Sequence, residues 1–308
     1  MQSDQNIAEV MRRVLALDIG GSFVKAGLVS ATGLTAEFAP VPVDADGDAE
    51  SIVHTFAGVV RTGLSAAGGH VAGIGIAMPG PFDYARGISL MTRKFGSING
   101  LELTGALREA LPEIAEVPVR FRHDANAFLA GEMWLGAARG ATRAIGVTLG
   151  TGIGVACCLD GAFINNPLGS PAPEVSVWSR PYKGGIVEDF ISTAGLVARY
   201  RRVCPAYAPE GGVKGISEAA KRHEPGAVRL FQELGEDLCA VLLPLCERFF
   251  PERIVFGGQI AKDFGLFGPV LQAALVRSGN PQEVVVGRLG THAALLGATL
   301  DERRTGEG

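Results

Sequence analysis

A strand, a glycine-rich turn and a second strand occur in the same order at two places, and this repeat constrains the fold most. The first copy spans residues 14–30 around Asp18-Ile19-Gly20-Gly21-Ser22, and the second spans residues 143–159 around Gly150-Thr151-Gly152-Ile153-Gly154. β-Branched and apolar residues make up the flanking strands in both copies. The duplication predicts two related α/β domains that face a cleft, where ligands usually bind.

The length and composition agree with two globular domains. The chain has 308 residues, of which 47% are apolar and 19% are charged. This length is greater than a domain with a single hydrophobic core usually has. Its net charge of −4 argues against nucleic acid or an anionic membrane as a partner, because both require a clustered basic surface. We therefore expect a small-molecule partner. A polyanion such as ATP is compatible, because Mg²⁺ and backbone N–H groups can bind its phosphates.

The cysteines and apolar segments indicate an intracellular protein. The five cysteines are odd in number and form no C-x-x-C pair, so buried free thiols are expected rather than disulfides or a zinc site. No apolar stretch reaches membrane-spanning length, and the apolar run that ends at Asp18 is too short for a signal peptide. We expect a cytoplasmic location.

Each glycine turn can present backbone N–H groups to an anion. Asp18, at the end of its strand, can hold a hydrated Mg²⁺, because this ion prefers one or two carboxylates together with water and phosphate oxygens. The alternative is a plain hairpin turn that Asp18 caps. Two such loops at matching positions favour polyphosphate binding, whereas neither loop fits the P-loop or Rossmann pattern.

A third polar segment, His123-Asp124-Ala125-Asn126, follows a short apolar strand predicted at residues 117–121. A carboxylate placed between the two halves can accept a proton from a hydroxyl while that oxygen attacks the γ-phosphoryl group of ATP. Asp124 also precedes a helical pattern at residues 125–135, so it can cap that helix. The two roles are compatible.

Together these segments resemble the ROK family of repressors and sugar kinases, within the actin/hexokinase superfamily. The similarity covers residues 13–300 and rests on residues 16–22, 73–81, 123–127, 149–154, 254–258 and 295–298. It implies an α/β fold of two duplicated actin-like (ribonuclease H-like) domains around a cleft. The smaller N-terminal domain would comprise residues 12–122 plus 292–303, and the larger C-terminal domain residues 123–291.

The resemblance also implies an ATP- and Mg²⁺-dependent homodimeric kinase, with Asp124 as general base and a sugar or polyol as acceptor. Asp18 would hold Mg²⁺ through water. The implied ATP- and phosphate-binding residues are Gly20, Gly21, Ser22, Lys25, Gly150, Thr151, Gly152, Gly257 and Gly258. The implied substrate-binding residues are Gly80, Ser97, Asn99, His123, Asp124, Glu174 and Glu188. The short segment before the first strand leaves little room for the DNA-binding domain of the family's repressors.

The acceptor side departs from the family pattern. ROK members carry Glu-x-Gly-His and a zinc-binding cysteine cluster, whereas residues 174–177 read Glu-Val-Ser-Val here and the cluster is absent, so no zinc is expected. The usual Asn before the catalytic Asp is His123, and Asn-Leu-Pro-Gly-Trp reads Ser-Ile-Asn-Gly-Leu at residues 97–101. Sites that hydrogen-bond particular hydroxyls reject analogues strongly. These changes predict a modified sugar or a cyclitol rather than glucose.

Other interpretations stay open. The chain could be a ligand-sensing regulator without catalysis, or an ordinary hexose or amino-sugar kinase. Trp178 and Tyr182 are interpreted as packing aromatics, with a new wall of the acceptor pocket as the alternative. Arg93 and Lys94 are interpreted as solvated loop charges, with a position near the acceptor as the alternative.

Overall fold

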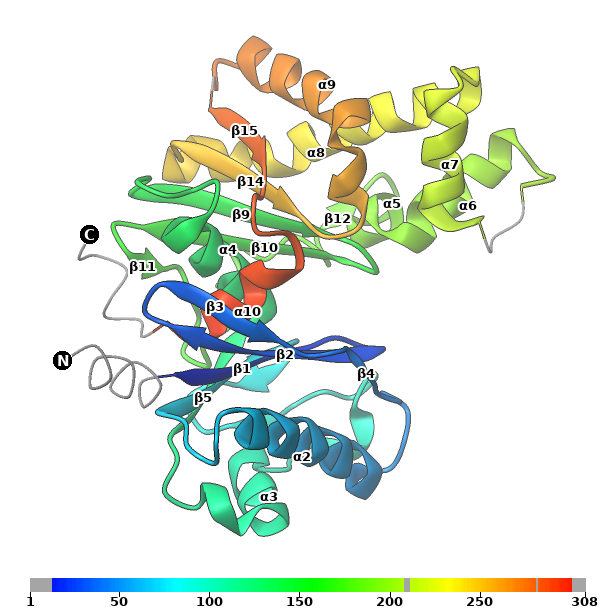
Figure 1. Cartoon of the computed structure of the whole chain (residues 1–308). Coiled ribbons are helices and arrows are strands. Elements are labelled where there is room, and N and C mark those ends of the chain that lie inside the picture. Colours follow the sequence, from blue (N-terminus) through cyan, green and yellow to red (C-terminus); the bar gives the residue numbers. More distant parts are fainter. Residues whose placement is uncertain (1–12, 208–210, 281, 301–308) are drawn as a thin grey trace. The chain divides into compact units, whose positions relative to one another are not determined.

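The computed structural model describes residues 13–207, 211–280 and 282–300 (Figure 1). These residues form two compact units, each with its own sheet and apolar core. The first unit comprises residues 13–135, 165–170 and 291–300, and the second comprises the rest of the described chain. None of the described helices is both long enough and apolar enough to cross a membrane.

The sheet of the first unit has the strand order β3-β2-β1-β5-β8, with β4 pairing on β2. Its strands are β1 (Val14–Ile19), β2 (Phe23–Ser30), β3 (Gly33–Glu37), β4 (Val41–Pro42), β5 (Gly73–Met78) and β8 (Val119–His123). The pairs β1–β2 and β2–β3 are antiparallel, whereas β1–β5 and β5–β8 are parallel. A two-stranded hairpin, β6 (Phe82–Asp83) and β7 (Ile88–Ser89), follows β5.

The sequence predicts the third strand at residues 37–43, and this prediction is wrong. The strand begins at Gly33, whose φ of 127° lies where glycine is favoured, so the chain reverses directly after β2. Pro40 and Pro42 lack the N–H group that a continued ladder needs. The segment that was expected to be one strand therefore holds only the end of β3 and the two residues of β4.

Helices cover both faces of the first sheet (Figure 1). On one face lie α2 (Ala49–Ala66) and α3 (Leu103–Ala110), and on the other lie α4 (Asp124–Leu135) and α10 (Ala293–Ala298). Asp48 caps α2 by accepting the Ser51 N–H group at 2.7 Å. Glu102 caps α3, where its carboxylate accepts the N–H groups of Thr104 and Gly105. Single 3₁₀ turns occur at η1 (Gly96–Ile98) and η2 (Pro112–Ile114).

Glycines let α4 and α10 pack backbone to backbone. A Cβ atom added to Gly297 would overlap the carbonyl group of Ala127, and one added to Gly131 would overlap that of Ala293. This contact places α4 in the first unit, whereas the domain division predicted from the sequence assigns residues 123–135 to the C-terminal domain. Residues 12 and 301–303 of that predicted division lie outside the described residues.

The second unit repeats the topology of the first. Its strand order is β11-β10-β9-β14-β15, formed by β9 (Arg143–Leu149), β10 (Ile153–Leu159), β11 (Ala162–Phe163), β14 (Arg253–Gly257) and β15 (Glu283–Val286). As in the first sheet, two antiparallel pairings are followed by two parallel ones. The predicted α/β fold with a duplicated unit is confirmed.

The second unit also contains most of the helices. They are α5 (Glu188–Ile191), α6 (Thr193–Val203), α7 (Gly212–Lys221), α8 (Pro225–Phe249) and α9 (Phe264–Arg277), with the 3₁₀ turn η4 (Ile260–Asp263), whereas the 3₁₀ turn η5 (Gly290–His292) lies where the chain returns to the first unit. A small hairpin, β12 (Pro181–Tyr182) and β13 (Gly185–Ile186), precedes α5. All five cysteines are free, and four of them are buried.

Candidate active site

Three parallel strands of the first unit end side by side. Asp18 on β1 pairs with Ala77 on β5, and Met78 on β5 pairs with His123 on β8. The carboxyl ends of these strands therefore meet at one edge of the sheet, the position at which open α/β sheets commonly bind ligands. At that edge, Asp18 lies near the end of β1, the turn that contains Gly80 follows β5, and Asp124 follows β8.

The first glycine loop joins β1 to β2, and a charged pair spans its base. The N–H group of Gly20 donates to the carbonyl of Phe23 at 3.0 Å, which closes the turn. Lys25 lies opposite Asp18 in the ladder, and its Nζ is 3.0 Å from Asp18 Oδ2. Burial raises the pKa of Asp18, Lys25 partly offsets this, and the charge of Asp124 raises it further. Asp18 and Asp124 are therefore close enough to repel each other.

Asp124 is anchored through one of its two carboxylate oxygens. Its Oδ1 accepts the N–H group of Ala125 at 2.7 Å and lies 3.1 Å from Nδ1 of His123. In the described part of the chain, Oδ2 has no hydrogen-bond partner, and the side chain is 45% exposed. The carboxylate is thus fixed in orientation while one oxygen stays available to a ligand.

His123 and Tyr84 form the buried wall beside this carboxylate. Burial lowers the pKa of His123, and Asp124 offsets only part of that shift, so the imidazole is neutral near pH 7. Nδ1 of His123 accepts the N–H group of Ala125 at 3.2 Å, so the neutral ring carries its proton on Nε2. The Tyr84 ring packs edge-on against His123 at 5.8 Å, and its hydroxyl donates to the Met78 carbonyl at 2.9 Å.

Tyr84 is a site residue that the sequence reasoning missed. Burial and the charge of Asp124 raise its pKa well above the ordinary value, which places the phenol near that carboxylate. A Cβ atom on Gly80 would lie 3.5 Å from the Tyr84 hydroxyl and 3.5 Å from the His123 ring, so the turn passes closely over both. The only sequence signal is an aromatic residue shortly after the glycine–proline turn.

Ser97 and Asn99 donate hydrogen bonds within their own region. Ser97 Oγ donates to the carbonyl of Gly47 at 2.7 Å, and Asn99 Nδ2 donates to the carbonyl of Met91 at 2.8 Å. These bonds fix the loop of residues 91–99 in the first unit. Any contact with substrate would have to come from their remaining polar atoms.

In the second unit, two predicted nucleotide-binding segments lie together. Gly257, at the end of β14, pairs with Thr148, one residue before β9 ends. A Cβ atom on Gly258, whose φ is 89°, would overlap the backbone of Leu149. The Gly257–Gly258 turn therefore packs at the start of the Gly150–Gly152 loop, at the carboxyl edge of this sheet.

Helix α6 holds the second glycine loop in place. Thr193, its first residue, donates both its N–H group, at 2.8 Å, and its Oγ1, at 2.9 Å, to the carbonyl of Gly150. Gly150 in turn donates to the carbonyl of Gly152 at 3.0 Å. Thr151 is exposed at the tip of the loop.

The two predicted acceptor glutamates have different surroundings. The carboxylate of Glu188 lies against Gly152, where it accepts the N–H group of Ile153 at 3.4 Å and fills the space that a side chain at position 152 would need. Oε1 of Glu174 instead lies 3.5 Å from Nη2 of Arg248. Within the described residues no hydrogen bond or ion pair joins Glu174 to Glu188.

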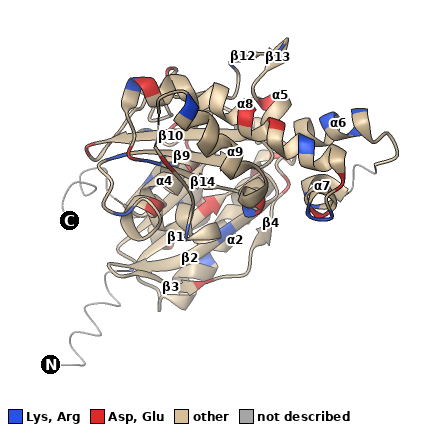
Figure 2. Cartoon of the chain, turned by 90° about the horizontal axis from the view of Figure 1, so that it is seen from above, with Lys and Arg blue, Asp and Glu red and all other residues tan. Residues whose placement is uncertain are grey.

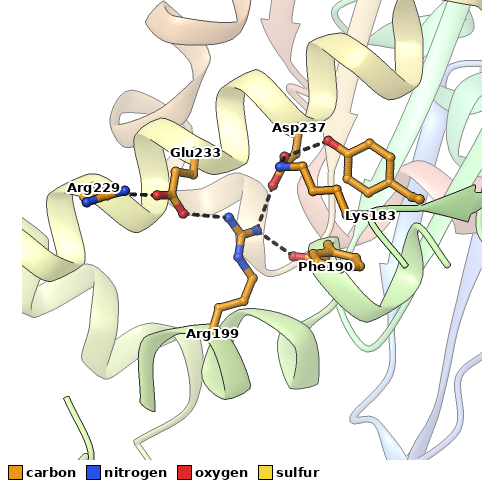
Figure 3. Close-up of polar contacts among 7 residues, drawn as sticks. Lys183, Phe190, Arg199, Arg229, Glu233 and Asp237 are labelled. Atoms are coloured by element: carbon orange, nitrogen blue, oxygen red, sulfur yellow. Dashed lines mark hydrogen bonds and ion pairs between the residues drawn. The ribbon is translucent and has the colours of Figure 1, made fainter. Parts of the chain in front are cut away.

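An ionic network around the buried Asp237 fixes the helix that carries Glu188 (Figure 3). Asp237 on α8 accepts hydrogen bonds from the Tyr182 hydroxyl at 2.7 Å, Lys183 Nζ at 2.5 Å and the Arg199 guanidinium at 2.8 Å. Arg199 also donates to the carbonyl of Phe190 in α5 at 3.0 Å. The network thereby ties the β12–β13 hairpin and α5 to α8.

In this region a basic side chain of α6 forms ion pairs with acidic side chains of α8. Figure 2 shows basic segments on α6 beside acidic segments on α8. Arg199 extends the network to Glu233 at 3.0 Å, and Glu233 pairs with Arg229 at 2.8 Å. Only 2% of the Asp237 side chain is exposed, so its charge depends on these partners.

The donor set at the first edge suits a hydrated magnesium ion better than a fully protein-ligated metal. Over residues 13–207, 211–280 and 282–300, no three His, Cys, Asp or Glu side chains are grouped to hold an ion. Mg²⁺ commonly keeps several waters and takes one or two carboxylates with substrate phosphates. Asp18, next to the first glycine loop, meets that requirement.

Comparison with known proteins gives matches along the whole described chain. A family model described as the ROK family matches residues 14–300. A glucokinase of Thermotoga maritima is 26% identical over 310 residues, covering 93% of this chain and 96% of the relative. A β-glucoside kinase of Klebsiella pneumoniae is 28% identical over 298 residues, covering 93% and 94%. The crystal structure of a ROK family glucokinase from Streptomyces griseus, in complex with glucose and AMPPNP, superposes with a TM-score of 0.74 at 25% identity, covering 93% of this chain and 97% of that one.

Proposed function

Because this chain belongs to the ROK family, we propose that it is an ATP-dependent sugar kinase in which Asp124 is the general base. The observation that carries the proposal is how the two carboxylate oxygens of Asp124 are bonded. Oδ1 accepts the N–H group of Ala125, whereas Oδ2 has no hydrogen-bond partner among the described residues, and the charge of Asp124 acts on Asp18 at the base of the first glycine loop. The names of the relatives, glucokinases and β-glucoside kinases, support a sugar as the acceptor.

The proposed reaction is transfer of the γ-phosphoryl group of ATP to an acceptor hydroxyl. The hydroxyl oxygen forms a bond to the γ-phosphorus, the bond from that phosphorus to the bridging oxygen breaks, and ADP leaves. Oδ2 of Asp124 takes the hydroxyl proton. The Ala125 N–H group donates to Oδ1 of Asp124 and also to Nδ1 of His123, so the base keeps its orientation during the step.

The other predicted residues receive roles within their own units. We propose that Gly20, Gly21, Ser22, Lys25 and the Gly150–Gly152 loop bind phosphates, and that Gly257 and Gly258 bind the adenosine side. Asp18 would hold Mg²⁺ through water, and the ion would neutralise phosphate charge. The acceptor would contact Gly80, Ser97, Asn99, His123, Glu174 and Glu188.

The nature of the acceptor is a finer part of the proposal. His123 and the loop that contains Asn99 differ from the family pattern, and Glu188 keeps a carboxylate for a hydroxyl pair. We propose a modified sugar or a cyclitol as the preferred acceptor, because altered hydrogen-bonding partners discriminate strongly between analogues. The family resemblance is the support for a homodimer.

The test is ADP release by the purified protein with ATP and a panel of glucose, β-glucosides, amino sugars and cyclitols. We expect Asp124→Asn to lower kcat on the order of 10²- to 10⁴-fold, because the amide cannot accept the proton. Glu109→Gln, an exposed residue of α3, is the control and should leave kcat unchanged.

Two results would contradict different parts of the proposal. Full activity of Asp124→Asn would remove the proposed base. Efficient phosphorylation of glucose with none of the cyclitols would refute the preferred acceptor and leave the kinase itself intact. Binding of a sugar without transfer by the unaltered protein would favour a ligand-sensing regulator.

A further inference from the structure

Lys94, which the sequence suggests is either a solvated loop charge or a residue near the acceptor, lies against the first glycine loop. A Cβ atom placed on Gly21 would be 3.3 Å from Nζ of Lys94, 3.3 Å from its Cδ and 3.5 Å from its Cε. The Cδ, Cε and Nζ atoms of Lys94 therefore lie beside the α-carbon of Gly21. Both residues belong to the first unit.

The core of the first unit determines where Lys94 lies. The next residue, Phe95, is fully buried and packs on Phe56 at a ring distance of 6.0 Å. Phe95 has a φ of 56°, and its N–H group donates to the carbonyl of Ala45 at 2.7 Å. A non-glycine residue adopts this conformation only where its surroundings enforce it. The backbone beside Lys94 is thus set by packing and not by contacts of Lys94 itself.

The two lysines at this loop differ in charge pairing. Lys25, on β2, is held by Asp18 at 3.0 Å. Lys94 makes no hydrogen bond or ion pair with any residue that the structure describes, and it is exposed. An ammonium group without a carboxylate partner, placed over a turn whose glycines favour close approach of an anion, suits a phosphate oxygen.

We propose that Lys94 binds an oxygen of the phosphoryl group that is transferred to the acceptor. This inference rests on the proposed kinase activity. During transfer, negative charge is spread over the three equatorial oxygens of the phosphoryl group, and a fixed cation stabilises it. Lys94 donates a hydrogen bond and exchanges no proton, since the hydroxyl proton goes to Asp124. Lys94 therefore acts in catalysis through its positive charge and not as an acid or a base.

The first experiment separates rate from binding. We expect Lys94→Met to lower kcat on the order of a hundredfold, with the KM of the acceptor changed less than about threefold. Lys94→Arg should recover part of the rate, because it keeps the charge. Lys214→Met, whose side chain is 89% exposed on α7, is the matched control. A rise in acceptor KM alone, or unchanged kinetics of Lys94→Met, overturns the assignment.

The second experiment does not need a known acceptor. Titration calorimetry with tripolyphosphate at low salt should show about tenfold weaker binding by Lys94→Met and unchanged binding by Lys214→Met. If the unaltered protein transfers no phosphate but this difference appears, the kinase proposal fails while the anion site stands. If transfer depends on Asp124 but Lys94→Met equals the control in both experiments, the anion site fails while the kinase proposal stands.

Discussion

His123 couples the proposed base to the buried side of the site, and its protonation should affect stability. Burial lowers the pKa of His123 below the ordinary value of 6.5, so the unfolded chain takes up a proton more readily than the folded chain. Its contribution to stability is therefore complete above pH 6.5 and declines as the pH falls below that value towards the pKa of the folded state.

We expect the free energy of unfolding to fall between about pH 7 and pH 5.5, and to fall less in His123→Asn, which cannot titrate. Urea unfolding at both pH values measures this difference. Asp124, the charged neighbour, opposes the lowering, so Asp124→Asn should enlarge the pH effect. An equal loss of stability in the unaltered protein and in His123→Asn would contradict the lowered pKa of His123.

The residues of the candidate site differ in how far sequence could predict them. Asp124 and the glycine loops follow directly from strands, so short segments are enough to identify them. The pairing of Lys25 with Asp18 depends on the register of the β1–β2 ladder, and the contact of Lys94 with Gly21 joins segments more than seventy positions apart in numbering. Local patterns do not contain that information.

The contact between α4 and α10 depends on two glycines that allow backbone approach. We expect Gly297→Ala to lower the free energy of unfolding by about 1–3 kcal/mol or more, because the added methyl group overlaps the Ala127 carbonyl. Gly58→Ala is the matched control on α2, where a Cβ atom meets nothing within 4 Å. It should raise stability by about 0.5–1 kcal/mol through helix propensity. Chemical denaturation measures both, and equal effects would contradict the packing argument.

The network around Asp237 is the corresponding element-scale feature of the second unit. Asp237→Ala leaves Arg199 without its buried partner, so we expect a loss of about 3–5 kcal/mol in the free energy of unfolding. Glu233→Ala, which removes a carboxylate that is 38% exposed, should cost about 0–1 kcal/mol. If the two variants unfold at the same denaturant concentration, the buried carboxylate of Asp237 contributes no more to stability than the more exposed carboxylate of Glu233.

Elements with strong local signals were predicted well, and those set by distant pairing were not. The apolar spacing of residues 48–67 predicts a helix, and the observed α2 spans Ala49–Ala66. The third strand was misplaced because Gly33 restarts the ladder earlier than the apolar pattern suggests. The assignment of α4 to a unit depends on its contact with α10, about 160 positions later in numbering, which no local pattern reveals.

At the scale of the whole molecule, the two large apolar cores formed by the described residues are separate, one in each sheet-containing unit. Regions with separate cores commonly open as separate cooperative units. We therefore expect Gly297→Ala to increase amide hydrogen exchange in β1, β5 and α4, and Asp237→Ala to increase it in α6 and α8. Hydrogen exchange followed by mass spectrometry maps both variants. Loss of protection across both sheets from either substitution would show that the chain unfolds as one unit, and each unit's core would then not set its own stability.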